Sequence, residues 1–537
     1  MRPGRGGHAS HDYDWAIVGS GFGGSVSALR LAERGYRVAV IEQGKRYADS
    51  DFASDSRELG KVWWAPAIGM RGIMKLTPFR HVTVISGVGV GGGSLVYANT
   101  LYVPHSDDFY RHPGWDRLGD WRAELAPHYE TARRMLGVTD CVAAGASEQV
   151  MRGVADDLGV AEGFRNTPVG VYFGEPGRTV ADPYFDGAGP ERTGCVRCGK
   201  CLLGCRYGAK NTLVKNYLYL AEREGARVID SQRVVDLRPL GGGSRGWELS
   251  CRRTGLSPSR RRTVTAGRVV LAGGALGTNQ LLRACRDRGS LPRISDRLGD
   301  LVRTNSETIT AATSEREGAD YRGEVAITAS VFPDGHTHFT NNTYGDGGDL
   351  VGLNFGPLTN GAPPLRRAAS ALGAVARHPR RWLDPRRLRG YSRRTIIFTV
   401  MQSTDTALRF RARRGPLRLL GPLETELSTG EPPESFIPIA NEVASRAAER
   451  MGGYPQSSLA ESLLGTPGTA HLLGGAVIGG SPAEGVVDPD HRVFGYENLM
   501  ICDGSAVPAN PGVNPSLTIT AMAERAMSKV PDAAGGA

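Results

Sequence analysis

The stretch Tyr13-Asp-Trp-Ala-Ile-Val18-Gly19-Ser-Gly21-Phe-Gly-Gly24, near the start of this 537-residue chain, decides its fold. Tyr13–Val18 is a short and mainly apolar run that predicts a buried strand, and the glycines after it predict a tight turn. The turn opens a helix over Ser25–Arg34, and a second strand over Arg37–Ile41 ends on Glu42. Glycines between a strand and a helix, with an acidic residue about 20 positions later, are the fingerprint of a dinucleotide-binding α/β unit.

The chemistry of a bound dinucleotide explains the residue types in this turn. Gly19 permits the tight turn, Gly21 lets the backbone approach a pyrophosphate, and Gly24 lets the helix pack closely on the strand. The N-terminus of the helix then presents unpaired N–H groups and the positive end of its dipole to the phosphates. Glu42 is placed to accept hydrogen bonds from ribose hydroxyls. The predicted nucleotide-binding residues of this unit are Gly19, Gly21, Phe22, Gly23, Gly24 and Glu42.

Further pieces of the same domain recur later in the chain. A second glycine-dense loop, Gly87–Ser94, follows an apolar run, and its lack of Cβ atoms lets the backbone approach a flat or charged ligand. Arg268–Ala272 is predicted as a buried strand that turns into a helix through Gly273–Leu282. Near the end of the chain, a strand at Leu499–Cys502 leads through a loop to a helix at Thr518–Met527. The dinucleotide-binding domain is therefore expected to be discontinuous.

The segments between these pieces have a different pattern. Residues 120–136 carry apolar side chains at helical spacing, and residues 326–351 form short alternating runs that are typical of antiparallel strands. We predict a Rossmann-like α/β domain of residues 12–105, 195–310 and 465–530. An interleaved α+β substrate-binding domain, built on an antiparallel sheet, is predicted to comprise residues 106–194 and 311–464. Residues 359–395 are predicted to be a basic, lid-like surface insertion, although a solvated loop of this kind needs no function.

Composition gives no support for a nucleic-acid partner. The formal net charge is +10, but only seven of the 65 basic residues are lysines, and the arginines are spread along the whole chain. No recognised nucleic-acid-binding module accompanies this charge. We also find no apolar core of a secretory signal in Met1–Asp12 and no transmembrane run, so we expect no transmembrane segment and a cytoplasmic location.

Four motifs, in the correct order, resemble the glucose-methanol-choline (GMC) flavin oxidoreductases over nearly the full chain. They are the N-terminal fingerprint, Gly87–Ser94, Gly273–Leu282 and a C-terminal run with His471-Leu-Leu-Gly-Gly, Asp503-Gly-Ser and Gly512-Val-Asn514-Pro-Ser. The likeness is strongest to the cholesterol-oxidase-like bacterial branch. It implies FAD bound between the two domains, with its pyrophosphate on the first glycine turn and its flavin near the second. The residues that the resemblance adds to the predicted FAD site are Gly87, Gly89, Gly91, Gly92, Gly93, Ser94, Gly273, Asp503, Gly504, Asn514 and Pro515.

The resemblance also implies an alcohol oxidation in which His471 and Asn514 are the catalytic residues. Such a reaction removes the hydroxyl proton while the hydride on the same carbon moves to flavin N5. An imidazole can accept the proton, and an amide can hold the substrate oxygen by hydrogen bonding. We expect a lipophilic alcohol as substrate, sterol-like or another secondary metabolite, and either oxygen or an electron-carrier protein as acceptor.

Two aspects of this function stay open at the level of sequence. The GMC fold also carries a non-redox lyase that retains its flavin, and fold alone does not decide function. Cholesterol oxidases also use a glutamate to isomerise the steroid double bond. We looked for it at Leu353-Asn354-Phe355, which has no carboxylate, so no residue for a coupled isomerase step is identified.

Four of the eight cysteines form a cluster with the spacing Cys195-x2-Cys198-x2-Cys201-x3-Cys205. Bacterial ferredoxins use this spacing for iron–sulfur ligands, although Arg206 stands where a proline usually follows. Four thiolates also satisfy tetrahedral zinc, and unmetallated structural thiols are the third interpretation. An iron–sulfur cluster would pass electrons singly to an external carrier and would make the enzyme a dehydrogenase.

Overall fold

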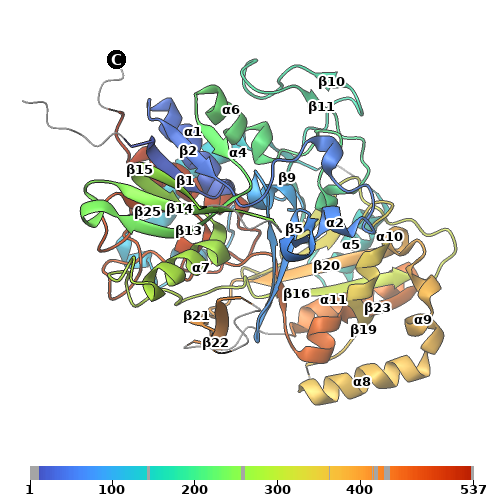
Figure 1. Cartoon of the computed structure of the whole chain (residues 1–537). Coiled ribbons are helices and arrows are strands. Elements are labelled where there is room, and N and C mark those ends of the chain that lie inside the picture. Colours follow the sequence, from blue (N-terminus) through green and yellow to red (C-terminus); the bar gives the residue numbers. More distant parts are fainter. Residues whose placement is uncertain are drawn as a thin grey trace, which may run out of the picture.

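The strand before the first glycine turn lies near the centre of a seven-stranded sheet (Figure 1). The computed structural model describes residues 11–141, 145–255, 261–361, 363–413, 415, 421–428 and 436–533. β1 (Tyr13–Val18) pairs in parallel with β2 (Val38–Ile41) on one side and with β15 (Arg262–Leu271) on the other. The strand order is β12-β2-β1-β15-β14-β13, and β25 also pairs with the end of β15. The remaining strands are β12 (Arg227–Ile229), β13 (Gln232–Pro239), β14 (Trp247–Arg253) and β25 (Leu499–Ile501).

The parallel strands of this sheet end at one edge. β1, β2, β12, β15 and β25 run in the same direction, whereas β13 and β14 are antiparallel to their neighbours. Gly19, Glu42, Gly273 and Asp503 all follow closely on the carboxyl ends of parallel strands. In open α/β sheets ligands bind at this edge, so the fold collects the predicted nucleotide-binding residues there.

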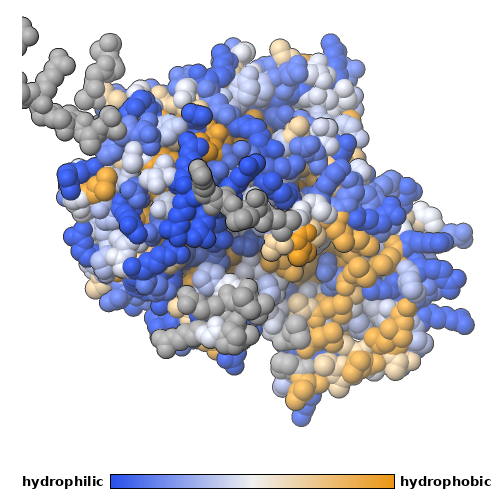
Figure 2. Space-filling model, in the orientation of Figure 1, coloured by the Kyte–Doolittle hydropathy of each residue, from blue (hydrophilic) through white to orange (hydrophobic). Residues whose placement is uncertain are grey.

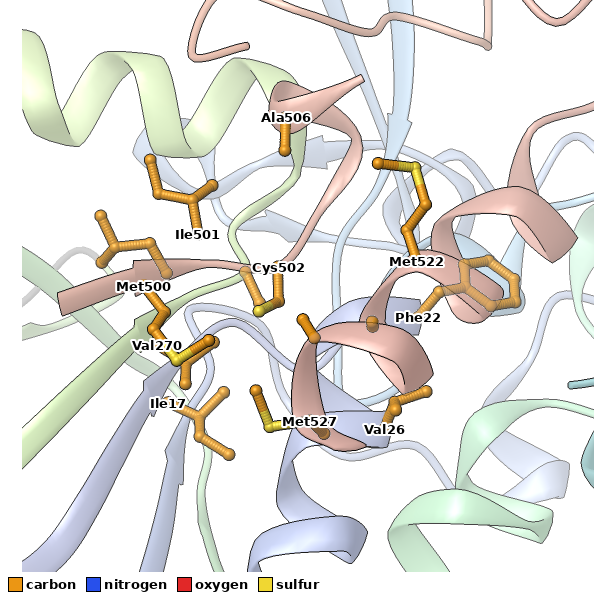
Figure 3. Close-up of a cluster of buried hydrophobic side chains, with 14 of the residues drawn as sticks. Ile17, Phe22, Val26, Val270, Met500, Ile501, Cys502, Ala506, Met522 and Met527 are labelled. Atoms are coloured by element: carbon orange, nitrogen blue, oxygen red, sulfur yellow. The ribbon is translucent and has the colours of Figure 1, made fainter. Parts of the chain in front are cut away.

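Strands and helices share one large apolar core. Ile17 and Val270 of the sheet lie in the same cluster as Val26 of α1 and as Met522 and Met527 of α12 (Figure 3). α12 packs between α1 and α4, and α6 packs on α1. α7 contacts β13 and lies below the sheet in Figure 1, whereas α1 and α6 lie above it. This arrangement confirms the predicted Rossmann-like α/β domain. Its helices are α1 (Phe22–Glu33), α4 (Trp121–Met135), α6 (Tyr217–Arg223), α7 (Gly274–Asp287) and α12 (Ser516–Ser528).

The helix predicted at residues 120–136 is present as α4, but it packs on the first domain. Its buried Trp121, Leu125 and Tyr129 belong to the same core as α1 and α12. The guanidinium of Arg525 in α12 lies over the Trp121 ring, 4.8 Å from the ring centroid. This part of the predicted substrate-binding domain thus joins the dinucleotide-binding domain, because the apolar side of α4 is buried against α12.

The second sheet is antiparallel, with the order β19-β23-β16-β20-β18-β17-β8. In the middle of this sheet, β16 (Glu307–Ser314) pairs with β20 (Thr395–Gln402). β16 begins before the domain boundary that was predicted at residue 311. Helices α5 and α11 supply apolar side chains to its core, where Val443 lies with Phe339 and Phe398. Of the strands predicted over residues 326–351, β17 and β18 are present. The other elements are β8 (Phe164–Asn166), β17 (Ala329–Val331), β18 (Thr337–Asn342), β19 (Phe355–Pro357), β23 (Gly453–Ser458), α5 (Ala146–Asp157) and α11 (Pro438–Met451).

The basic insertion at residues 359–395, which was predicted as a lid-like surface insertion or a solvated loop, is largely helical. It contains α8 (Pro364–Arg377), α9 (Pro379–Leu383) and α10 (Tyr391–Arg394). Its prolines do not prevent this, because those of α8 and α9 stand in the first turn, where the missing N–H has no intrahelical partner. α8 packs on β19 and on a π-helix at Ala460–Leu464. In the described ranges, no helix has the length and apolar character needed to cross a membrane.

Short elements complete the described fold. β3 (Trp64–Ala65) pairs with β4 (Met70–Arg71), β7 (Val138–Asp140) with β9 (Pro168–Gly170), β10 (Thr179–Val180) with β11 (Arg192–Thr193), and β21 (Leu408–Ala412) with β22 (Leu423–Leu427). β6 (Thr83–Gly87) lies between β5 (Met74–Pro78) and β24 (Gly468–Thr469). The short helices include α2 (Leu59–Val62) and α3 (Asp107–Tyr110).

Candidate active site

A cavity of about 1020 Å³ extends from the carboxyl edge of the first sheet to the second sheet. The turn after β1, the loop after β6 and the start of α7 form one end of its wall. Glu307, His471 and Asn514 line it as well. Because both domains contribute to its wall, the cavity can hold an elongated ligand with a nucleotide end and a reactive end.

The first glycine turn has a geometry that other residues cannot adopt. Gly19 has a φ of 103°, and a Cβ at this position would lie 2.3 Å from the Ala272 carbonyl oxygen. A Cβ on Gly24 would lie 2.1 Å from the Gly19 carbonyl oxygen, so α1 approaches the strand this closely only with glycine here. Gly21 differs, because a Cβ there would meet no atom within 4 Å, and the residue lines the cavity. The open side of Gly21 leaves room for a phosphate at the N-terminus of α1.

The second glycine loop packs directly on the first. A Cβ on Gly92 would lie 2.7 Å from Gly21 Cα, and Gly91 N donates to Ser20 Oγ at 3.1 Å. Ser94 is fully buried, and its Oγ donates to the Gly91 carbonyl oxygen at 2.7 Å. Seven of the predicted FAD residues in these two loops line the cavity: Gly19, Gly21, Phe22, Gly23, Gly87, Gly92 and Gly93. Gly24, Gly89, Gly91 and Ser94 shape the two loops behind its wall.

Two buried carboxylates follow parallel strands at the cavity wall. Glu42 Oε2 accepts hydrogen bonds from Ser20 N at 3.1 Å and from Ser20 Oγ at 2.8 Å. Asp503 Oδ2 accepts from Gly274 N at 2.9 Å and from Thr278 Oγ1 at 2.6 Å, which joins the end of β25 to the start of α7. Burial raises the pKa of both carboxyl groups. Glu42 and Asp503 both line the cavity, together with the predicted residues Gly273, Gly504 and Pro515.

His471, Asn514 and Glu307 meet although they come from three separate segments. His471 follows β24, Asn514 comes shortly before α12, and Glu307 begins β16. His471 Nδ1 donates to Glu307 Oε2 at 2.6 Å, and Asn514 Nδ2 donates to His471 Nε2 at 3.0 Å. With these partners the ring carries its proton on Nδ1 and offers a lone pair at Nε2. The His471 side chain is 15% exposed and that of Glu307 only 2%, so bulk water has little access to the pair.

The side-chain amide oxygen of Asn514 is a hydrogen-bond acceptor that has no donor among the described residues. This atom, Oδ1, is buried. A buried oxygen left without a partner costs about 1–3 kcal/mol, so such atoms in a cavity wall mark a place where a ligand or water donates. Asn514 Oδ1 thus fits a donor on a bound cofactor or substrate.

Glu307 is the residue of this site that the sequence analysis missed. It is a different residue from the isomerase glutamate sought at Leu353-Asn354-Phe355, a stretch that spans the end of a 3-10 helix and the start of β19 and does not line the cavity. Glu307 accepts from Ala470 N through Oε1 at 2.8 Å, in addition to its bond with His471. A lone acidic residue at the start of a buried strand is the one signal in the sequence that could have identified it.

A second buried carboxyl group, that of Glu461, lies near Glu307. Glu461 belongs to the π-helix, and its carboxyl accepts from Thr308 Oγ1 at 2.7 Å and from Ile309 N at 3.2 Å. Burial raises the pKa of Glu461 to about 8, so this group is largely protonated at neutral pH. Glu461 therefore attaches the π-helix to the start of β16 without adding a negative charge beside Glu307.

The four clustered cysteines line a separate cavity of about 100 Å³. Burial raises the pKa of Cys195 to about 12 and also raises the pKa values of Cys198 and Cys201, which keeps these thiols protonated at neutral pH. Within the residues that the structure describes, no group of three or more His, Cys, Asp or Glu side chains is placed to hold a metal ion. The zinc and iron–sulfur interpretations therefore lack a formed ligand site, and the arrangement favours unmetallated thiols.

Known proteins match this chain along nearly its whole length. The family described as NAD(P)-binding Rossmann-like domain matches residues 17–48, and GMC oxidoreductase families match residues 190–286 and 430–523. A cholesterol oxidase from Mycobacterium tuberculosis is 47% identical, over 97% of this chain and 91% of its own length. One from Acinetobacter baumannii is 42% identical, over 97% of this chain and 95% of its own. The solved structure of pyridoxine 4-oxidase from Mesorbium loti has a TM-score of 0.59 at 15% identity, over 96% of this chain and 98% of its own, and indicates the shared fold alone.

Proposed function

Since this chain belongs to the GMC oxidoreductase family and is an FAD-dependent alcohol oxidase or dehydrogenase, we propose that it oxidises a sterol-like alcohol to a ketone with oxygen as acceptor. The observation that carries the proposal is the meeting of His471, Asn514 and Glu307 in a cavity that also has a dinucleotide-type wall. In the part of the cavity that the second domain contributes, Ile309, Ile327 and Tyr344 lie beside the polar Asn342 and Thr399. An apolar pocket with a few polar groups at one place suits a large alcohol with a single hydroxyl.

The residues at the nucleotide end fit FAD. The open side of Gly21 at the N-terminus of α1 suits the pyrophosphate, and Glu42 suits the ribose hydroxyls of the adenosine part. Asp503 and Gly504 are proposed to face the ribityl or phosphate region. FAD, when bound, accepts the hydride and so supplies the redox chemistry. Ser86–Ser94 contains no histidine for a covalent flavin link, which supports noncovalent binding.

His471 is proposed to take the hydroxyl proton at Nε2. Glu307 holds the Nδ1 proton and would stabilise the positive charge that arises on the ring when Nε2 is protonated. Asn514, which donates to Nε2 in this structure, would bind the substrate oxygen and keep the hydroxyl carbon in place. In this reaction the protein supplies oriented hydrogen bonds and one proton acceptor.

Anaerobic mixing of the FAD-loaded enzyme with cholesterol tests this proposal against the lyase alternative. We expect the absorbance of the oxidised flavin to bleach and one ketone to form per flavin, because a hydride must leave the alcohol carbon. Cholesteryl acetate, whose hydroxyl is blocked, is the control and should leave the band unchanged. Unchanged absorbance with cleavage of a carbon–carbon bond of an alcohol would support the lyase, whereas bleaching by smaller alcohols but not by sterols would overturn the substrate class.

A further inference from the structure

Helix α8 carries an exposed apolar stripe that no described part of the chain covers. Leu365 is 88% exposed and Leu372 is 66% exposed. With the exposed Ala369 and Ala376 they follow the spacing i, i+4, i+7 and i+11, which places all four on one face of the helix. Leu383 of the adjoining α9 is 68% exposed as well. Figure 2 shows hydrophobic surface along this part of the molecule, at its lower right.

The opposite face of α8 is firmly attached to the protein. Ala371 and Arg367 are buried, and Arg367 donates to the Glu461 carbonyl oxygen at 3.3 Å. This contact places α8 on the π-helix that also binds the start of β16 through Thr308. The leucines are therefore held outward by a docked helix, and their exposure does not come from a loose end of the chain.

Positive charge lies beside the apolar stripe. Residues 363–394 contain ten arginines and a single acidic residue, Asp384. Arg381 pairs with Glu315, Arg386 with Asp384, and Arg393 with Asp346. Arg366, Arg377 and Arg380 are exposed and form no ion pair within the described part of the chain.

We propose that α8 and α9 form a docking surface for an anionic lipid bilayer. A helix with a leucine face bordered by arginines lies flat in the boundary between headgroups and acyl chains, where the leucines leave water and the guanidinium groups meet lipid phosphates. α8 lies at the lower edge of the molecule in Figure 1, below the other labelled helices and strands. A nucleic acid would use the arginines but would give the leucines nothing to bury against. The surplus of unpaired arginines favours an anionic surface over a second copy of the chain, which carries the same positive charge here.

Sedimentation of the full-length, FAD-loaded protein with vesicles tests this surface without any alcohol present, so its outcome does not depend on the proposed substrate. We expect binding to vesicles of phosphatidylcholine with phosphatidylglycerol, weaker binding to phosphatidylcholine alone, and a loss of binding at high salt because salt screens the arginines. The double variant Leu365→Glu/Leu372→Glu should bind at least about tenfold more weakly, since it removes two apolar anchors and adds two negative charges. Arg366→Gln/Arg380→Gln should weaken binding only to the anionic vesicles.

The matched control is Leu59→Glu, because Leu59 is also an exposed leucine (47%) but belongs to α2, away from α8 in Figure 1. This variant should bind vesicles like the wild type. All variants should keep their FAD and their melting temperature, because the exchanged side chains are exposed. Absent vesicle binding by the wild type, or equal binding by the leucine double variant, would overturn the proposal. So would a double variant whose only change is the loss of self-association in sedimentation velocity, which would assign the stripe to a second copy.

Discussion

Two hydrogen bonds fix the His471 ring, and each limits what the imidazole can do. Glu307 accepts the Nδ1 proton at 2.6 Å, which leaves Nε2 as the basic nitrogen, and Asn514 occupies Nε2 at 3.0 Å. An imidazole that is held in one tautomer and orientation does not have to reorient before it accepts a proton from a hydroxyl. The arrangement also explains why a glutamate is tolerated at 2% exposure, since a buried carboxylate needs hydrogen-bond donors and here has two.

Removing the imidazole should stop turnover without emptying the FAD site. We expect His471→Ala to lower kcat by roughly 10²–10⁴-fold, the usual loss for a general acid or base, with unchanged flavin content. Glu307→Gln should give a smaller loss of kcat, because the amide keeps the shape of the carboxylate but not its charge. Steady-state rates at saturating sterol, together with flavin absorbance per protein, measure both. Near-normal turnover of His471→Ala under these conditions would assign the proton to another group.

The sequence predicted two of these three residues for a clear reason. His471 and Asn514 belong to short sequence motifs that can be recognised locally, His471-Leu-Leu-Gly-Gly and Gly512-Val-Asn514-Pro-Ser. Glu307 is separated from His471 by 164 positions and stands in no motif. Only the pairing of β6 with β24, and the packing of β16 beside them, brings the two side chains together. Sequence spacing carries no information on such a contact.

At the scale of elements, the glycines of the β1–α1 turn have different roles. Gly19 and Gly24 are needed by the fold itself, since a Cβ at either position would collide with backbone. Gly21 meets nothing and leaves space only for a ligand. We therefore expect fold and cofactor binding to depend on different residues of this turn.

Two alanine variants of this turn should separate these roles. We expect Gly24→Ala to lower the melting temperature of the protein even without FAD, because its Cβ would lie 2.1 Å from the Gly19 carbonyl oxygen. Gly21→Ala should leave the melting temperature of the FAD-free protein unchanged but weaken FAD binding, because a methyl group would stand where the phosphate approaches. Thermal melts with and without added FAD measure both effects. An FAD affinity of Gly21→Ala equal to that of the wild type would place the pyrophosphate elsewhere.

The apolar spacing of a sequence can indicate a helix, but it does not identify the element against which the helix packs. The apolar spacing of residues 120–136 correctly indicated α4, but the sequence did not reveal that Trp121 and Tyr129 pack against α12. In the same way, the prolines and arginines of residues 359–395 indicated a surface insertion but not its helices, although proline in a first turn is compatible with α8 and α9. Local patterns report periodicity, and the partner of an apolar face is decided by the rest of the fold.

At the scale of the whole molecule, the two cavities share a wall. Asn99 and Cys201 line the small cysteine cavity, and their chain neighbours Ala98, Thr100 and Leu202 line the large one. A redox centre among the cysteines would therefore lie close to the flavin end. Among the described residues, however, the cysteines form no metal-holding group of the kind that an electron relay requires.

The electron acceptor can be decided on the same protein. We expect protein purified without air to contain no iron and no acid-labile sulfide, because the described residues form no metal-holding group. In air it should form one hydrogen peroxide per sterol oxidised, since oxygen then takes both electrons from the reduced flavin. Cys198→Ser should change neither flavin bleaching nor its reoxidation, and Cys251→Ser, in β14 outside the cluster, is the matched control. Iron and sulfide in the protein, with a Cys198→Ser variant that bleaches normally but reduces an external acceptor slowly, would instead make the cysteines an iron–sulfur relay and the enzyme a dehydrogenase.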